Sequence, residues 1–556
     1  MSRYRLSNSR SVLAVSTFLA VILLTLAMGE WPNLYRFAAG GSGAGAGFHT
    51  PLRLDDDVMI SLRTGYMLGE TGKPSMNRTD VAQPSTSYAI PYLYSLLLHG
   101  FSRESAIYVY ALLGLISVAL TMCLIVLYAS SDVLGVIVAA ALCLTSTHLL
   151  YGLGGWDHLF QGLFLTAATC LSLSQNVRPR RAFIVALLLV LGTVFRPDGG
   201  LLALGILATL WFSTLRWKVL LSGIIPYIAL MGLVLAINYH QFDHVTPTTA
   251  RLKIGGAPSL GYILHYILAN GLLSYSALTL FAGLILLLLA YHIPAAHRQV
   301  IPIVIGCVAT VSFALYNSDY FPGARMVWSS TCVLGATFAV LAPRTIFPEV
   351  QGAKSSWSQA SSLVRLILAA YVVVIAVGIT AVAMRRRVQE ATISSQRAET
   401  SPVAQQYVIA HWINSNLQPK DGSIGFFYLG VSYDLPSFEV ADFLGKADES
   451  IATLKAQQGP PGHNKWDLDR TLTKWKPQAI VPPGPVDPNL PETKENSHKH
   501  APDLLLNQEI AAGFRYCYVQ ASDLGVIDRW GFFVRKDIAV RHVGELRCSE
   551  DPSQKR

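Results

Sequence analysis

Three consecutive aspartates, Asp55, Asp56 and Asp57, are the residues whose type and spacing most suggest chemistry. Adjacent carboxylates repel each other, so one of them can hold a raised pKa and act as a general base. A structural role suits them equally well, because aspartate is a preferred N-cap residue. The mixed apolar and polar segment at residues 58–63 then predicts a helix lying at a membrane interface.

Asp157 and His158 interrupt two apolar runs. An ionisable pair at the start of a helix can bind a polar substrate, or Asp157 can simply cap the helix that follows. Arg196-Pro197-Asp198 divides the apolar stretch 182–212, because proline ends the helix before it. The two charges can serve a site, or they can pair as a structural salt bridge at the break.

Two further loops combine acids, cations and hydroxyls. Thr248 precedes Arg251 and Lys253, a cationic loop that can neutralise phosphate. Asp319 and Arg325 bracket a short segment with proline and glycine. Solvated loop cations and an ordinary turn are the alternatives for these two loops.

Long apolar helices must position these loops. Hydrophobic residues make up 52% of the 556-residue chain and charged residues only 14%, which is too apolar for one soluble domain. The apolar runs stop near Met384, so the sequence predicts a polytopic α-helical membrane core at 1–386 and a polar C-terminal domain at 387–556. We expect about eleven transmembrane helices, at residues 12–28, 107–128, 133–150, 159–173, 182–194, 201–212, 219–237, 272–291, 300–315, 327–341 and 366–384.

Alternating these spans from a cytoplasmic N-terminus places most basic loops inside, as the positive-inside rule prefers. The candidate loops described above then all emerge on the outer face, and an odd count puts the C-terminal domain outside as well. Only the basic run at 385–387 falls on the wrong side. Loops that converge independently on one face predict a shared site there.

Charge and cysteine content exclude other classes. The net charge of +9 comes without a basic stripe carrying interleaved aromatics, so nucleic acid is not an expected partner. The sequence holds no CxxC or HExxH metal motif. Cys517 and Cys548 can pair if the C-terminal domain faces an oxidising compartment, although spacing alone does not decide this.

The C-terminal domain has a mixed α/β pattern. Residues 403–417 are typical of a helix, and residues 423–428, 479–481, 514–520 and 531–536 of strands. A second interfacial helix is expected at 87–99.

In order along most of its length, the chain resembles the GT-C superfamily of polyprenyl-phosphate-dependent glycosyltransferases, most of all the actinobacterial terminal arabinofuranosyltransferases. The likeness is carried by Asp56-Asp57 with Ile60, Leu62 and Arg63, by Asn77 and Ser85-Thr86, by Gly155-Trp156-Asp157, by Phe195-Arg196-Pro197-Asp198, by the run from Pro247 to Lys253, and in the C-terminal domain by Asp442-Phe443-Leu444-Gly445 and Gly462-His463-Asn464-Lys465. Pro322 departs from that family, which has histidine there.

The resemblance implies a GT-C membrane core with an extracytoplasmic α/β domain in a bacterial plasma membrane. It further implies inverting transfer of a sugar, arabinofuranose in that family, from a polyprenyl-phosphate donor to an acceptor hydroxyl on a cell-envelope glycan or a surface protein such as pilin. Asp56 would be the general base, and Asp57 would orient the acceptor or hold a divalent cation such as Mg²⁺ or Mn²⁺. Arg196, Lys253, Arg325 and His463 would bind the donor phosphate, and Asp157, His158, Asp198, Thr248 and Asp319 the sugar or acceptor.

Two rival classes remain open. A transporter would carry charged or Gly/Pro-broken segments near the bilayer midplane in two matching halves, whereas the charges here cluster at the ends of the apolar runs. A protein that binds a lipid-linked glycan without catalysis would keep its ligand when Asp56 and Asp57 are both replaced.

Overall fold

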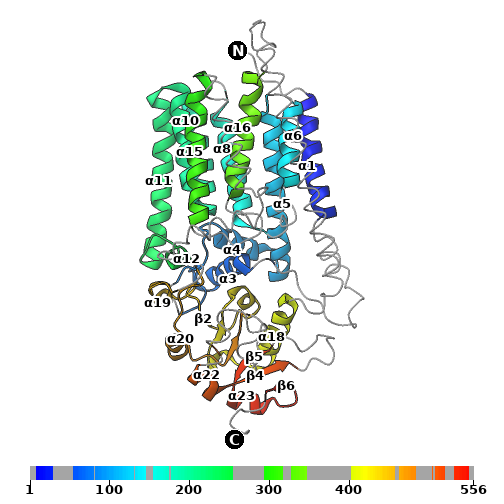
Figure 1. Ribbon diagram of the computed structural model, residues 1–556, viewed down its shortest axis with the longest axis vertical. Coiled ribbons are helices and arrows are strands. Elements are labelled where there is room, and N and C mark those ends of the chain that lie inside the picture. Colours follow the sequence, from blue (N-terminus) through cyan, green and yellow to red (C-terminus); the bar gives the residue numbers. More distant parts are fainter. Residues whose placement is uncertain are drawn as a thin grey trace.

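A helical bundle and a smaller α/β domain are stacked end to end (Figure 1). The computed structural model describes residues 8–28, 54, 56–79, 82–130, 132–145, 155–174, 177–253, 294–316, 327–346, 402–457, 462–483, 504, 507–519 and 531–549. The long helices of the bundle are α1 (Asn8–Met28), α5 (Arg103–Tyr128), α6 (Asp132–Thr145), α8 (Asp157–Ser172), α9 (Pro179–Phe195), α10 (Gly199–Thr214), α11 (Trp217–Phe242), α15 (Pro294–Tyr316) and α16 (Trp328–Ile346).

Nine of the eleven predicted apolar runs therefore lie in helices, and the runs at 272–291 and 366–384 lie outside the described residues. By length and apolar composition alone, two of the described helices, α5 and α11, could cross a membrane, and shorter apolar helical segments lie at Ser11–Leu23, Gly199–Thr214, Gln299–Phe313 and Trp328–Leu341. The number of membrane spans stays a prediction.

From α5 to α11 the successive helices of the bundle run in opposite directions, so alternate connections between them lie at the same end (Figure 1). The predicted break in the apolar stretch is confirmed: α9 ends at Phe195 and α10 begins at Gly199, with Pro197 between them. This connection and the start of α8 both lie at the end that faces the α/β domain (Figure 1). The side chains of Arg196 and Asp157 meet there.

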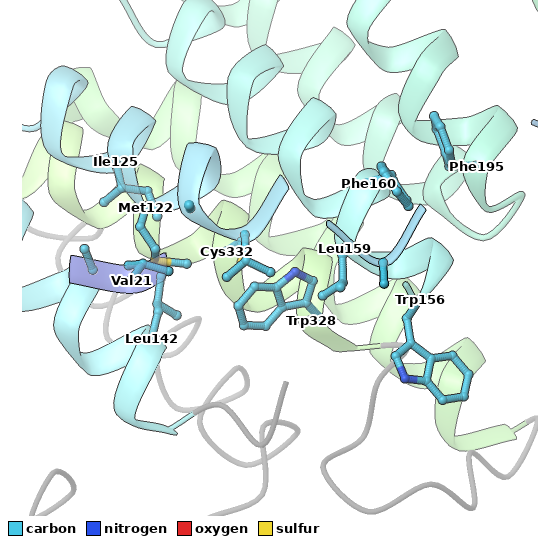
Figure 2. Packing of buried hydrophobic residues seen from close by; sticks show 14 of the residues in the cluster. Val21, Met122, Ile125, Leu142, Trp156, Leu159, Phe160, Phe195, Trp328 and Cys332 are labelled. Carbon is cyan, nitrogen blue, oxygen red and sulfur yellow. The ribbon is translucent and has the colours of Figure 1, made fainter. Parts of the chain in front are cut away.

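Packing in the apolar core fixes the position of the start of α8 relative to the end of α9 (Figure 2). Phe160 of α8 stacks on Phe195 of α9 with ring centroids 4.8 Å apart. Two residues further along α8, a Cβ at Gly162 would lie 2.7 Å from the indole nitrogen of the fully buried Trp328, so α8 and α16 pack closely. Core packing thereby fixes where Asp157 and Arg196 stand.

Two further helices, α3 (Asp56–Thr71) and α4 (Ile90–Gly100), lie between the bundle and the α/β domain (Figure 1). They contain the segments predicted to lie at an interface. The second begins three residues later than expected, because Ser87 Oγ accepts hydrogen bonds from the backbone N–H groups of Ala89 and Ile90 and Pro91 occupies the first turn.

The α/β domain is built on a six-stranded mixed sheet of order β2-β1-β3-β5-β4-β6. β1 pairs in parallel with β2 and β3, and the remaining neighbours are antiparallel. The strands are β1 (Ile424–Phe426), β2 (Val440–Asp442), β3 (Ala479–Val481), β4 (Phe514–Val519), β5 (Phe532–Arg535) and β6 (Leu546–Cys548). The four predicted strands are confirmed. β2 and β6 were not predicted, because three residues carry too little alternation to be recognised.

Helices surround this sheet (Figure 1). α18 confirms the helix predicted at 403–417. The helical segments are α12 (Thr248–Lys253), which precedes the domain in sequence, α18 (Pro402–Asn416), η4 (Pro419–Asp421), η5 (Leu429–Asp434), α19 (Glu449–Ala452), α20 (Leu468–Trp475), α22 (Gln508–Gly513) and α23 (Lys536–Arg541).

A buried arginine joins α3 to the α/β domain. Arg63 is 1% exposed and donates hydrogen bonds to the carbonyl oxygens of Leu435 at 2.9 Å and Phe438 at 2.7 Å, and also to that of Ser432. Buried cationic donors are stable only when their hydrogen bonds are met. These carbonyls therefore hold the α/β domain against α3, and with it against the first turn of that helix.

A disulfide links Cys517 of β4 to Cys548 of the edge strand β6. It answers the question that spacing left open. The bond joins residues 31 apart in sequence, and closing a loop of that size typically stabilises a domain by about 2–4 kcal/mol.

We expect Cys517→Ser to lower the melting temperature of the purified protein, and reductant to have the same effect on the wild type. Cys123→Ser is the matched control, because Cys123 is a free cysteine. A melting temperature unchanged by both reduction and Cys517→Ser would contradict the expected stabilisation.

Candidate functional site

The predicted acidic pair stands in the first turn of α3, where the bundle meets the α/β domain. Lys446 reaches both carboxylates from the α/β domain: its Nζ lies 3.0 Å from Oδ1 of Asp57 and 3.7 Å from Oδ2 of Asp56. The backbone N–H of Gly430 donates a 2.6 Å hydrogen bond to Oδ1 of Asp56. A Cβ at Gly430 would lie 2.6 Å from the same oxygen, so this close approach requires glycine.

The surroundings of Asp56 suit a base. Burial raises the pKa of its carboxyl, Lys446 lowers it, Asp57 raises it and the Gly430 N–H lowers it, with a net upward direction. A general base works best when its pKa lies near the working pH. Lys446 itself stays protonated, because burial lowers its pKa less than the two aspartates raise it.

Lys446 lies in the loop that follows β2, and hydrogen bonds to Asp442 close this loop. Asp442 is fully buried, and its carboxylate accepts hydrogen bonds from the backbone N–H groups of Leu444 and Ala447, on either side of the lysine. Burial raises the pKa of Asp442 to about 6. Gly445 has φ +77°, a conformation that glycine adopts readily.

A second charged group lies at the start of α8 and the end of α9. Arg196 Nη1 donates to both oxygens of Asp157 at 2.9 and 3.1 Å, and its Nε to Oδ1 of Asp198 at 3.2 Å. Gln161 Nε2 donates to the same oxygen of Asp198 at 3.2 Å. His158 is fully buried, with Nδ1 3.9 Å from Oδ1 of Asp157. The salt-bridge alternative for Arg196 and Asp198 is thus present in the structure.

The segment 82–89 connects this charged group to α3 and to α12. Ser85 Oγ lies 2.9 Å from the hydroxyl of Ser61 on α3. The next residue, Thr86, donates to Oδ2 of Asp157 at 3.3 Å. At the start of α12, the backbone N–H of Gln83 donates a hydrogen bond to the hydroxyl of Thr248, and the backbone N–H of Thr248 donates one to the carbonyl oxygen of Gln83. The acidic pair and the ion-paired group therefore belong to one polar region.

Glu449 of the α/β domain contacts α12 and completes this region. Its carboxylate accepts a hydrogen bond from Thr248 Oγ1 at 3.3 Å and forms an ion pair with Arg251, and its Oε2 lies 3.5 Å from Nε2 of His244. Lys253, at the end of α12, has its side-chain carbons about 3.6 Å from the Cβ position of Gly462. His463 follows, and its ring lies edge-on to that of Tyr428, 6.3 Å between centroids.

The structure thus gathers most of the predicted residues at one end of the bundle. Arg325 and Asp319 lie outside the described residues. Sequence reasoning missed Lys446, Gly430 and Glu449. One signal for Lys446 was that it directly follows Asp442-Phe443-Leu444-Gly445, a run that resembles the family. This run indicates a loop, but it does not indicate where the side chain of the following lysine points.

A divalent cation would find few ligands of its own here. Within the described parts of the chain, no three His, Cys, Asp or Glu side chains lie close enough together to hold a metal ion. Asp57 could offer only carboxylate oxygens, and Lys446 already contacts one of them.

No protein-family profile and no curated protein sequence matches the chain. Among solved structures, ArnT from Cupriavidus metallidurans bound to undecaprenyl phosphate is similar over 95% of this chain and 98% of its own, at 14% identity and a TM-score of 0.51. Its apo state is similar over 94% and 97%, at 13% identity and the same TM-score. The oligosaccharyltransferase AglB from Archaeoglobus fulgidus, in complex with an inhibitory peptide and a dolichol-phosphate, is similar over 98% of this chain and 77% of its own. The identity is 11% and the TM-score 0.48. The chain therefore shares the overall fold of ArnT.

Proposed function

We propose that this chain is a membrane glycosyltransferase of the GT-C type, which moves a sugar from a polyprenyl-phosphate donor to an acceptor hydroxyl. The observation that carries the proposal is the pair Asp56-Asp57, held by Lys446 and Gly430 where the bundle end meets the α/β domain. A shared fold with ArnT, whose crystal structure contains undecaprenyl phosphate, supports the choice of donor. A carrier lipid anchored in a membrane presents its head group at such a boundary.

The site and the α/β domain would face the extracytoplasmic side of a bacterial plasma membrane. The opposite end of the bundle carries Arg178, Arg180 and Arg181 around the start of α9, and Arg216 and Lys218 around the start of α11. Basic loops favour the cytoplasmic side. The disulfide between β4 and β6 agrees, because such bonds persist in oxidising compartments.

The proposed reaction uses the α3 pair as its base. Asp56 accepts the proton of the acceptor hydroxyl while the acceptor oxygen forms a bond to the anomeric carbon of the sugar. The bond from that carbon to the phosphate oxygen breaks, and the polyprenyl phosphate leaves with the electron pair. Lys253 and His463 lie near Tyr428 and Gly462, and they would neutralise the charge that develops on the phosphate.

Sugar hydroxyls would meet the ion-paired group. Oδ2 of Asp198 is buried and has no hydrogen-bond partner within the described residues, so it can accept from a hydroxyl. Asp157, His158 and Thr248 would complete this surface. For Asp319 and Arg325, which lie outside the described residues, the family resemblance implies contacts with the sugar or acceptor and with the donor phosphate, respectively. Arg196, which pairs with two carboxylates, would hold the loops in place and offer the phosphate only its remaining donors.

The finer assignment follows the family resemblance. We propose arabinofuranose as the sugar, and as acceptor a cell-envelope glycan or a surface protein such as pilin. The membrane core would span residues 1–386 and the extracytoplasmic domain 387–556. A transporter, or a lipid-linked glycan-binding protein without transferase activity, is the alternative class.

The test is an assay of the purified protein in lipid nanodiscs with radiolabelled polyprenyl-phosphoryl arabinofuranose and an arabinan fragment. We expect label to appear in the acceptor and free polyprenyl phosphate to accumulate in equal amount. Donor binding without either product would favour the binding protein, and movement of donor across sealed vesicles without transfer would favour the transporter.

A further inference from the structure

Lys446 fills the space between the two carboxylates on which the proposed reaction depends. Its ammonium nitrogen lies 3.0 Å from Asp57 and 3.7 Å from Asp56, and its side chain is only 11% exposed. A metal ion held by both aspartates would need their oxygens at about 2.0–2.6 Å, and would have to share this space with the ammonium. Two cations that close together in a partly buried site repel each other.

The loop that carries Lys446 is built to keep it there. The buried carboxylate of Asp442 accepts from the N–H groups of Leu444 and Ala447 and so closes the backbone around the lysine. A Cβ at Gly445 would lie 2.8 Å from a methyl carbon of Ile451, so the loop packs tightly against α19. Lys446 therefore has little freedom to withdraw and admit an ion.

We propose that Lys446 is the resident cation of the Asp56–Asp57 pair and that the site works without a bound divalent metal, an inference that rests on the transferase function proposed above. The ammonium balances the two negative charges and fixes the direction of both carboxylates. It transfers no proton to substrate, so Lys446 is a positioning residue. Without it, two neighbouring carboxylates would face each other unscreened, which is an arrangement that attracts Mg²⁺ or Mn²⁺.

Metal binding tests this directly and does not depend on activity. The measurement is Mn²⁺ binding to the full-length purified protein, followed by electron paramagnetic resonance. The wild type and Asp57→Asn should bind the same amount of Mn²⁺, because the wild type holds no ion at Asp57. Lys446→Met should bind one additional ion, and the double variant Lys446→Met/Asp57→Asn should lose it again. Wild-type binding that disappears in Asp57→Asn would overturn the proposal.

Transfer activity gives the second measurement. With chelator present, the wild type should keep its rate, and Lys446→Met should lose at least about tenfold through misplacement of the two carboxylates. Mn²⁺ should restore part of that loss, and Lys446→Arg, which keeps the charge, should be less impaired than Lys446→Met. Lys420→Met is the matched control, because Lys420 is an exposed lysine of the same domain. A Lys446→Met rate equal to wild type in chelator would refute the assigned role. If the wild type shows no transfer, the proposed function fails, but the Mn²⁺ measurement still decides the inference about Lys446. If Lys446→Met does not fold, the comparison of the wild type with Asp57→Asn decides it alone.

Discussion

Asp56→Asn leaves the protein folded and in the membrane but lowers sugar transfer by about 10²–10⁴-fold, the usual contribution of a general base. The change keeps the shape of the side chain, and its amide oxygen can still accept the hydrogen bond from Gly430. What disappears is the capacity to take up the proton of the acceptor hydroxyl. The measurement is the rate of label transfer by purified variants at saturating donor.

Two further variants make the result specific. Asp421→Asn, at an exposed position of η4 in the α/β domain, should transfer at the wild-type rate. Donor binding by Asp56→Asn should stay within a few-fold of wild type, because an acceptor base contributes to the rate more than to donor affinity. Undiminished turnover by Asp56→Asn would exclude Asp56 as the base.

Arg196→Met has the largest expected effect on stability. Arg196 is 6% exposed and pairs with Asp157 and Asp198. Removing one partner of a buried ion pair leaves uncompensated charge and typically costs about 3–5 kcal/mol. We expect a clear fall in the melting temperature in detergent, and a smaller fall for Arg196→Lys, which keeps the charge but loses the planar fork.

A compensating variant tests the cause. Adding Asp157→Asn and Asp198→Asn to Arg196→Met should recover much of the lost stability, because the unpaired charges are then removed. Arg216→Met is the control, since Arg216 is an exposed cation at the opposite end of the bundle. If Arg196→Met melted like the wild type, the ion-paired group would not be holding the helix ends together.

Local signals in the sequence predicted much of the fold. The apolar runs predicted the helices, and Pro197 predicted the break between α9 and α10 because a proline acts on its own neighbours. The same signals do not reveal which helix ends touch. Arg196 meets Asp157 because Phe160 stacks on Phe195 in the core, and such packing depends on the whole bundle.

The acidic pair could be recognised from the sequence, but its partners could not. Gly430 lies 374 residues from Asp56 in the chain, and Lys446 lies 389 from Asp57. The contacts depend on the docking of the α/β domain against α3, to which the hydrogen bonds of Arg63 contribute. A lysine in a polar domain is usually solvated, so nothing local distinguished Lys446 from the others.

The shared location of these groups is tested most directly by labelling single introduced cysteines with a membrane-impermeant maleimide in intact cells. Lys73→Cys after α3, Val245→Cys before α12 and Lys420→Cys in the α/β domain all lie at exposed positions toward one end of the molecule, and Arg216→Cys lies at the other end. We expect the first three to be labelled from outside and Arg216→Cys only after permeabilisation. Labelling of Lys73→Cys and Val245→Cys from opposite sides of the membrane would contradict a single extracytoplasmic site.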